Sequence, residues 1–429
     1  MSTSNAAPRR ERILTFEEAR RCVLEHAASC TNRQPASEQV ALLDSVGRTL
    51  AEDLVADRDF PPFPRAARDG YSLRSADVQR TPAELEIVGE MRAGGDLPAG
   101  FVQLAAGEAI SIMTGAPVPF GADAVVMVEH TEGQGRHVRV LRSVTAGENV
   151  VPRGSEAAAK SVLVQRGTVI SAAQVALAAA VGNSQQSVYK RPRIAILSTG
   201  DEVVNITNAP KDNQIRNSNS FSLAAQVISA GGKPVQLAIA PDEPKRLRQL
   251  IAEGLEYDLL LVSGGVSAGE YDLVEDVLSE FSAEILFTGV QIQPGKPLLF
   301  GRVSRGRRAG NESPQPPIYF FGLPGNPIST MVTFELFARV MVHALAGASP
   351  LAPRTAMARL AHPVKVKTGL TRFFPARLSG SWNNIEVSRV PWQGSGDIAA
   401  FATADCLLVI PPDREQFDAG DIMTVVPIH

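Results

Sequence analysis

Apolar runs that alternate with helical patterns occupy the middle of the chain, from residue 190 to residue 346. Short apolar runs typical of buried strands recur at Ile194–Leu197, Val235–Ala240, Leu259–Val262, Glu284–Phe287, Leu298–Phe300 and Ile318–Phe321. Helical spacing of apolar residues is found at Phe221–Ser229, Pro244–Leu255, Asp272–Phe281 and Pro327–Leu345. This alternation predicts a doubly wound α/β sheet with helices on both faces, a fold that binds ligands at the carboxyl ends of its strands.

The pattern changes on both sides of this central domain. Thr15 and Glu18 form a capping box for a helix through about Ala28, and a second helical pattern runs from Ile170 to Val181. We therefore predict an α-rich linking domain from residues 13–50 and 143–189, with a β-rich module, residues 51–142, inserted into it. Residues 350–429 have only strand-like runs and predict a small C-terminal β-barrel, and residues 190–346 form the catalytic α/β domain.

The composition narrows the class of protein. A chain of 429 residues is too long for one core, and a net charge of −3 gives no basic footprint for nucleic acid. No apolar run approaches the roughly 18–20 residues that a membrane span needs, and no apolar segment follows the N-terminal arginines as in a signal peptide. The three cysteines are too few and too scattered for a disulfide framework or a zinc site. We expect a soluble, cytoplasmic protein of several domains.

The stretch from Leu259 to Asp272 carries the strongest chemical signal. An apolar run stops at Ser-Gly-Gly, and an acidic residue, Asp272, precedes a helical pattern. Backbone N–H groups of Gly264 and Gly265, together with the positive end of a helix, suit an anionic ligand. A carboxylate beside such a cradle is suited to hold a divalent metal that binds the anion. The alternative is an ordinary glycine turn of an α/β protein.

Acidic residues follow other predicted strands as well. Glu202 follows Ile194–Leu197, Asp242 follows Val235–Ala240, and Asp272 follows Leu259–Val262. Parallel strands place these ends along one edge, where clustered carboxylates repel one another unless they share a cation. The sequence therefore predicts a magnesium site formed by Glu202, Asp242 and Asp272. The alternative is that each acid only caps the helix that follows it.

Four segments of the central domain form distinct motifs, which are Ser198–Glu202, Ser263–Asp272, Pro294–Pro297 and Gly322–Pro327. Four more lie outside it, at Arg68–Tyr71, Met113–Pro117, Gly121–Val126 and Gln393–Asp397. The complete set resembles the molybdopterin molybdenumtransferase family of molybdenum cofactor biosynthesis, to which the C-terminal domain of gephyrin is related. The match covers nearly the whole chain in the family's order.

The resemblance implies an elongated homodimer of four-domain chains that inserts molybdate into adenylylated molybdopterin with Mg²⁺ and releases AMP. A molybdopterin adenylyltransferase would be a transient partner. The catalytic residues it implies are Glu202, Asp242, Asp272, Asp69 and Lys296, of which the first three would also bind the metal. The substrate-binding residues it implies are Thr114, Thr199, Ser263, Gly264, Gly265, Ser267, Pro324, Gly325, Asn326, Pro327 and Ser395.

Individual roles follow from the same resemblance. The Ser263–Gly265 loop would cradle the pterin phosphate, and Lys296 suits an oxyanion such as molybdate. Asp69 and Thr114 would close over the site of the partner subunit, although Asp69–Gly70 and Thr114–Gly115 could also be simple turns. Pro324 and Pro327 would shape a wall, and Ser395 would donate to the oxyanion or serve only a local turn.

Three segments depart from the family's pattern. Gln293 stands where many members have lysine, which removes a positive charge from the expected molybdate site and predicts weaker binding. Asn217 and Ser220 stand in a segment that is usually Asp-Ser-Asn-Arg. Leu370 follows Gly369 where arginine is frequent, although Arg372 and Arg377 lie close by in sequence.

Two other classes of function compete with the transferase. A nucleotide pyrophosphatase or a molybdopterin adenylyltransferase would need only the central domain, so the flanking β modules argue against both. A non-catalytic dimeric scaffold is the third possibility, since the related domain of gephyrin clusters receptors. The acidic strand ends favour catalysis.

Overall fold

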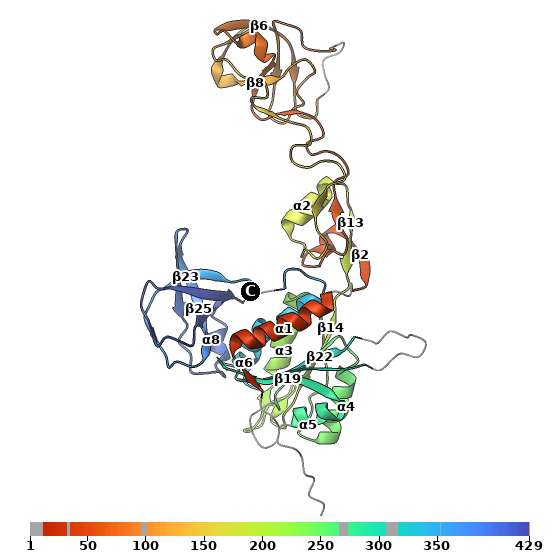
Figure 1. The fold of residues 1–429 in the computed structure, drawn as a ribbon, viewed down its shortest axis with the longest axis vertical. Coiled ribbons are helices and arrows are strands. Elements are labelled where there is room, and N and C mark those ends of the chain that lie inside the picture. The colour runs from red at the N-terminus through yellow and green to blue at the C-terminus, as the bar shows by residue number, and fades with distance from the viewer. Residues whose placement is uncertain are drawn as a thin grey trace, which may run out of the picture. The chain divides into compact units, whose positions relative to one another are not determined.

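The computed structural model describes residues 12–31, 35–95, 101–265, 273–305, 316–351 and 353–428. These residues fall into two compact units, which we describe separately. The first unit contains the described residues of 1–51, 167–171 and 186–429, and the second contains those of 52–166 and 172–185 (Figure 1).

A seven-stranded sheet is the centre of the first unit. Its strands, in spatial order, are β1 (Ile13–Leu14), β19 (Ala283–Val290), β21 (Pro297–Val303), β22 (Ile318–Leu323), β18 (Leu259–Ser263), β14 (Arg193–Ser198) and β17 (Lys233–Gln236). The strands β22, β18, β14 and β17 are parallel, as predicted. In contrast, β21 is antiparallel to both of its neighbours, so its first residues lie at the edge where the parallel strands end.

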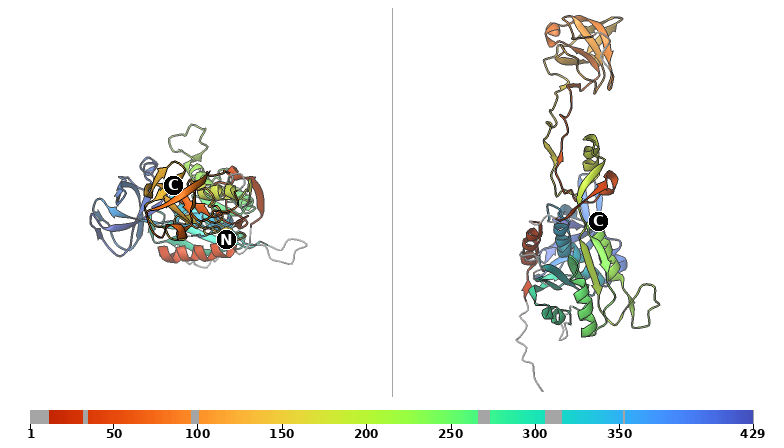
Figure 2. Two further views of the ribbon diagram at one scale, coloured as in Figure 1. Left: turned by 90° about the horizontal axis from the view of Figure 1, so that it is seen from above. Right: turned by 90° about the vertical axis from the view of Figure 1, so that its right-hand side faces the viewer.

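Helices cover both faces of this sheet, which confirms the predicted α/β layers. One face packs against α1 (Phe16–Thr31), α3 (Ser218–Ser229), α6 (Pro327–Thr333) and α7 (Arg339–Leu345), and the other against α4 (Pro244–Gly254) and α5 (Leu273–Glu280). Along β14, Ile194 and Ile196 join the first core while Ala195 and Leu197 join the second, because side chains alternate across a strand. The views in Figures 1 and 2 agree that α1 lies along one side of the sheet.

The N-terminus of α1 has the predicted capping box. The backbone N–H and hydroxyl of Thr15 both donate to Glu18 Oε2, and the Glu18 N–H donates to Thr15 Oγ1. This reciprocal pair satisfies N–H groups that have no partner within the helix. The helix α1 belongs to the same compact unit as the central sheet, and its residues Ala19, Val23 and Ala27 help to build the central core.

The helical segment from Pro327 to Leu345 contains a π-helical turn, η4 (Phe334–Ala338), between α6 and α7. Of the helices in the described residues, only the segment Pro327–Leu345 is long and apolar enough to cross a membrane, but 78% of its apolar stretch is buried within the protein. It is therefore placed like the core helix of a folded domain.

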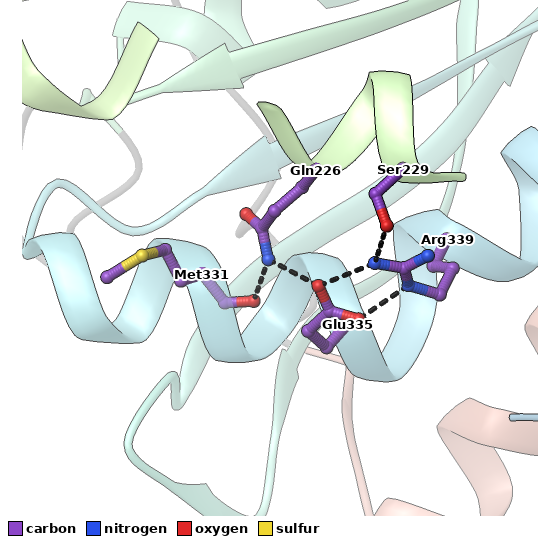
Figure 3. A network of polar contacts seen from close by, with 5 residues as sticks. All are labelled: Gln226, Ser229, Met331, Glu335 and Arg339. Carbon is purple, nitrogen blue, oxygen red and sulfur yellow. Dashed lines mark hydrogen bonds and ion pairs between the residues drawn. The ribbon is translucent and has the colours of Figure 1, made fainter. Parts of the chain in front are cut away.

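A buried polar network joins α3 to this π-helical turn (Figure 3). Glu335, 5% exposed, accepts hydrogen bonds from two nitrogens of Arg339. The side-chain amide of Gln226 donates to Glu335 Oε1 at 2.7 Å and to the Met331 carbonyl at 3.1 Å. Arg339 also reaches Ser229 Oγ at 3.5 Å. The network holds α3 and the turn together through charge-assisted hydrogen bonds.

The C-terminal part of the first unit is a closed barrel, which confirms the predicted small β-barrel. Its ring of five strands is β25 (Thr371–Ser381), β26 (Asn384–Arg389), β23 (Ala356–Leu360), β29 (Ile422–Pro427) and β27 (Cys406–Ile410), closed by pairing of β25 with β27. The short strand β20 (Ile292–Gln293) pairs in parallel with β25 and joins the barrel to the central domain.

The second unit is rich in strands. Its main sheet has the order β8 (Ala124–Met127), β5 (Gly70–Leu73), β7 (Glu108–Ile112), β6 (Ala83–Met91), β10 (His137–Val140) and β9 (Thr131–Gln134). Two apolar clusters lie in this unit, one built around Leu73 and Val126 and the other around Ile110 and Met91. The helix α2 (Ala172–Ala180) falls within the predicted range Ile170–Val181.

Candidate functional site

The carboxyl ends of β14, β18 and β22 meet at one edge of the central sheet, as the sequence predicts. Ser198 is the register partner of Ser263, which in turn is the partner of Leu323. The residues after the strands continue this contact, since the Thr199 N–H donates to the Ser263 carbonyl at 3.0 Å and the Gly264 N–H donates to the Leu323 carbonyl at 3.2 Å. Loops from distant parts of the sequence are therefore fixed side by side.

Gly264 and Thr199 form a tight backbone cradle at this edge. Gly264 has a φ of 91°, and a Cβ atom there would lie 2.8 Å from the Thr199 carbonyl oxygen and 2.9 Å from its hydroxyl. Any side chain at this position would displace Thr199. Thr199 is 5% exposed, and its buried hydroxyl oxygen has no hydrogen-bond partner among the described residues. Buried polar atoms are rarely left unpaired, so this hydroxyl requires a partner beyond the described residues.

Asn219, in the first turn of α3, also has a buried polar atom without a hydrogen-bond partner among the described residues. The sequence analysis did not identify it as a site residue. Its side-chain Nδ2 donates to Ser263 Oγ at 2.9 Å and to the Gly325 carbonyl at 2.7 Å. A carbonyl oxygen can only accept, so the contact with Gly325 fixes which way the amide points. The other amide atom, Asn219 Oδ1, is buried and has no hydrogen-bond partner within the part of the chain that the structure describes. The cradle therefore contains an acceptor that requires a hydrogen-bond donor.

The departure at Asn217 has a structural explanation. Asn217 is the N-cap of α3, where its Oδ1 accepts the Ser220 N–H at 3.1 Å and the Ser198 hydroxyl at 3.0 Å. Asparagine is as good an N-cap as aspartate. The helix that carries Asn219 is thus positioned without the usual acid.

Two of the three predicted metal ligands lie on neighbouring loops at this edge. Asp201 Oδ1 accepts the backbone N–H of Asp242 at 3.1 Å, and the Glu202 carboxylate lies over the backbone of Gly200. Asp201, Glu202 and Asp242 are exposed. Asp201 also was missed by the sequence analysis, although it stands in the same acidic pair as Glu202.

No three His, Cys, Asp or Glu residues within the described ranges come close enough together to hold a metal ion. The predicted third ligand, Asp272, and the predicted substrate contact Ser267 lie outside the described residues. The chemistry of the available donors fits Mg²⁺, because carboxylate oxygens are its preferred protein ligands. The magnesium site formed by Glu202, Asp242 and Asp272 stays a prediction.

The predicted wall, Pro324 to Pro327, forms the start of α6. Asn326 is the N-cap and Pro327 occupies the first helical turn, where a missing N–H costs nothing. The Thr330 hydroxyl donates to the Pro324 carbonyl at 2.5 Å and to the Asn326 carbonyl at 3.0 Å. Gly325 contacts Asn219 through its carbonyl. This segment thus borders the cradle directly.

The segments that carry Lys296 and Ser395 both pack against α6. The Ile328 N–H donates to the Ser395 carbonyl at 2.9 Å, which ties the loop of the C-terminal domain to the helix start. Gly295 lies against the side chain of Thr333, and Lys296 follows it with an exposed side chain. Because β21 is antiparallel, the loop before it reaches the same edge as the cradle.

Arg372 is the most unusual charge in this region. It is 7% exposed, its Nε donates to Gln293 Oε1 at 2.9 Å, and its Nη1 donates to the Leu370 carbonyl at 3.2 Å. No acidic residue within the described ranges forms an ion pair with it. A buried cation with only neutral partners is costly, which points to an anionic ligand. The sequence signal was an arginine directly before two phenylalanines at the start of a strand.

Asp69 and Thr114 contact each other within the second unit. Asp69 Oδ1 accepts the Thr114 N–H at 2.6 Å and the Thr114 hydroxyl at 2.7 Å. These hydrogen bonds, first that of the backbone N–H, lower the pKa of Asp69. The carboxylate therefore remains ionised at neutral pH. The pairing explains why the two motifs occur together, and its relation to the cradle stays a prediction.

Three family models together match most of this chain. They are the MoeA N-terminal region (domain I and II) at residues 14–182, a probable molybdopterin binding domain at residues 195–344, and the MoeA C-terminal region (domain IV) at residues 357–428. The class that fold and site define is therefore a multidomain protein built around a molybdopterin-binding domain.

Individual molybdopterin molybdenumtransferases are similar to this chain over most of its length. The molybdopterin molybdenumtransferase of Nostoc is 37% identical over 73% of this chain and 70% of its own length. That of Staphylococcus aureus is 30% identical over 90% of both chains, and molybdopterin molybdenumtransferase 1 of Mycobacterium tuberculosis is 30% identical over 91% of this chain and 94% of its own. The chain belongs to the molybdopterin molybdenumtransferase family, an enzyme family of molybdenum cofactor biosynthesis.

A solved structure supports the fold. The crystal structure of the molybdopterin biosynthesis MoeA protein from Pyrococcus horikoshii superposes with a TM-score of 0.74 and 26% identity, covering 97% of this chain and all of the other.

Proposed function

We propose that this enzyme inserts molybdenum from molybdate into adenylylated molybdopterin, with Mg²⁺ bound, and releases AMP. In this reaction the phosphoanhydride bond between the molybdopterin phosphate and AMP breaks, with an oxygen from water or molybdate ending on one of the two phosphates. Both dithiolene sulfurs bind molybdenum, and their protons leave with molybdate oxygen as water. The single observation that carries the proposal is the carboxyl edge of the sheet, where two buried polar atoms that have no partner among the described residues lie beside exposed acids.

The cradle contacts favour a particular orientation of the substrate. The Gly264 N–H is already used by Leu323, so it has no hydrogen to offer a phosphate. Asn219 Oδ1 needs a donor, and the Thr199 hydroxyl can donate or accept. A pterin ring carries amino and ring N–H donors. We therefore propose that the cradle holds the donor edge of the pterin and not its phosphate.

The oxyanion would be held on the other side of the α6 start. Lys296 and Arg372 supply positive charge there, and Ser395 supplies a polar side chain. A doubly charged tetrahedral anion suits a guanidinium that forms no ion pair with any acid of the described ranges.

Glu202 and Asp242, with Asp272, would hold Mg²⁺, which supplies charge neutralisation to the phosphates when bound. The work of this chain's own residues is to bind and align the substrate and to bring the acids and cations to one edge. Breaking a phosphoanhydride requires positioning and electrostatic stabilisation more than covalent catalysis.

Release of AMP from adenylylated molybdopterin tests the proposal. We expect release only when molybdate and Mg²⁺ are both present, and we expect Asp242→Asn to reduce it at least tenfold while folding is unchanged. Asp44→Asn is the matched control, because Asp44 is an exposed acid of the same unit that lies in the 3-10 helix η1 (Leu42–Ser45) and not on the loops that follow β14 and β17. AMP release without molybdate would support the pyrophosphatase alternative, and tight binding without turnover would support a scaffold.

We also propose that two copies assemble and that the Asp69–Thr114 pair of one copy serves the cradle of the other. The support is the family resemblance together with the separate location of this pair in the second unit. Mixing Asp69→Ala chains with Asp242→Asn chains should then restore part of the activity, because heterodimers contain one intact composite site. If heterodimers form and no activity returns, the composite site is wrong.

A further inference from the structure

A cavity lies at the edge of the central sheet opposite to the cradle, where the parallel strands begin. Its volume is about 550 Å³, and its wall includes residues just before β14 and β18 and the first residues of β22. The cradle lies where these same strands end. Along β14 the two edges are five residue steps apart, about 17 Å. The cavity is therefore separate from the candidate active site.

Positive charge dominates the wall of this cavity. Its charged lining residues are Lys190, Arg191, Arg302, Arg305 and Asp258. Arg302 is paired with Glu284 at 2.6 Å, and Asp258 accepts the backbone N–H of Arg193 at 2.7 Å. Because Arg302 is already paired, the charged residues that remain in the wall are three cations, Lys190, Arg191 and Arg305, and one carboxylate, Asp258.

The three remaining cations have no acidic partner within the described ranges. Arg305 donates from Nη2 to the carbonyls of Leu255 and Tyr257, at 2.9 and 3.1 Å, which hold the guanidinium in place without neutralising it. Lys190 and Arg191 are exposed, and no ion pair joins them to the described part of the chain. Cations held this way attract a phosphate, which accepts several charge-assisted hydrogen bonds at once.

The rest of the wall is apolar and rigid. Tyr319 is 2% exposed, and its hydroxyl lies 3.2 Å from His26 Nδ1 and 3.4 Å from Ser29 Oγ, so the ring is fixed. Proline side chains, which include Pro192 and Pro317, and Leu345 line the cavity beside it. A cavity of this size with a mostly apolar wall and a few convergent charges is typical of a small-molecule site.

We propose that this cavity is a second binding site, for an organic monophosphate of about mononucleotide size. The phosphate contacts Lys190, Arg191 and Arg305, and the ring contacts the prolines and Leu345. An inorganic anion would leave the apolar wall unused, and an uncharged nucleoside would leave the cations unpaired.

Calorimetric titration with three probes tests both halves of the site. Uridine monophosphate carries a ring and a phosphate, uridine lacks the charge, and inorganic phosphate lacks the ring. We expect the monophosphate to bind at least tenfold more tightly than either of the others, and its affinity to fall as salt is raised. Equal affinities for the monophosphate and inorganic phosphate would mean a site for a bare ion and would overturn the proposal, as would the absence of binding.

A double variant locates the binding. Lys190→Ala with Arg191→Ala should weaken the monophosphate about tenfold, since two exposed contacts with the phosphate are lost. The control, Lys365→Ala with Lys367→Ala, removes two exposed lysines from the C-terminal domain. If both double variants bind like the parent, the ligand occupies another site and the proposal is wrong.

Alkylation of cysteine gives an independent readout of position. Cys22 and Cys30 both pack against the central core, but of the two only Cys30 lines the cavity, and Cys406 is buried. The bound monophosphate should slow labelling of Cys30 and leave Cys22 unchanged, as measured on separate peptides by mass spectrometry. Protection of Cys30 that persists in the Lys190→Ala, Arg191→Ala variant would contradict the proposed phosphate contacts.

Discussion

Replacing Gln293 with glutamate is expected to stabilise the fold and to weaken molybdate binding at the same time. The side chain of Gln293 accepts a hydrogen bond from Arg372 Nε at 2.9 Å, and Arg372 is 7% exposed without an acidic partner in the described structure. A carboxylate at position 293 would give this buried cation the partner it lacks. The same carboxylate would remove the charge that we propose for holding the oxyanion.

The two effects can be estimated from the contact. A hydrogen bond between neutral groups contributes about 1 kcal/mol, and one between charged groups contributes roughly twice as much. Gln293 is exposed, so solvent screening reduces the gain in the free energy of unfolding to about 0.5–1 kcal/mol. Losing one of two cations from the oxyanion should cost about 1.4 kcal/mol of binding, which is tenfold in Kd.

Urea denaturation without molybdate measures the first effect, and calorimetric titration of molybdate measures the second. Gln291→Glu is the matched control, because Gln291 is an exposed glutamine directly before β20 for which no side-chain hydrogen bond occurs within the described ranges. It should leave both quantities within about 0.5 kcal/mol of the parent. If Gln293→Glu binds molybdate as the parent does, Arg372 is not part of the oxyanion site.

Gln293→Lys should have the opposite effects, a lower free energy of unfolding and tighter molybdate binding. Gln293→Lys removes the acceptor from Arg372 and places a second cation beside it, so the fold should be less stable when no anion is present. Molybdate should bind more tightly and restore the lost stability, because binding to the native state alone stabilises it. A variant that is equally stable with and without molybdate would contradict this reasoning.

Two further predictions concern the segment from Pro327 to Leu345. Glu335→Ala should lower the free energy of unfolding by about 3–5 kcal/mol, because it leaves the charge of Arg339 buried and unpaired. The double variant Glu335→Leu, Arg339→Met should recover most of this loss, because no buried charge remains. A small effect of Glu335→Ala in urea denaturation would contradict the role of the pair. Burial, and next the charge of Arg339, lowers the pKa of His343 to about 4. The unfolded chain takes up this proton near pH 6.5 and the folded chain only near pH 4, so stability should fall by roughly 3 kcal/mol between pH 7 and pH 4. His343→Gln should flatten that part of the pH profile, and an unchanged profile would refute the assignment.

Features set by local sequence could be predicted well. The helix after Thr15 begins where its capping box places it, because Thr15 and Glu18 satisfy each other's backbone groups within four residues. The run from Ile194 to Leu197 forms a strand with two buried faces because every residue in it is apolar. The cluster of strand ends at one edge follows from parallel pairing of such strands.

Features set by long-range pairing could not be predicted. The direction of β21 depends on its partners, since an apolar run reads the same in a parallel and an antiparallel strand. The orientation of the Asn219 amide depends on the Gly325 carbonyl, which is 106 residues away in the sequence. The third acid of the predicted metal site, Asp272, lies outside the described residues.

The two departures that first cast doubt on molybdate binding turn out to contact the same guanidinium. Gln293 accepts from Arg372 through its side chain, and Leu370 accepts from it through its carbonyl. A lysine at 293 could not accept this hydrogen bond and would repel the guanidinium instead. Glutamine is the residue that keeps a buried arginine in place without neutralising it. The contact with position 370 uses a backbone carbonyl that any residue there would offer, so of the two departures only Gln293 holds Arg372 through its side chain. We propose that Arg372 supplies positive charge to the oxyanion in a chain that has glutamine at 293 and leucine at 370.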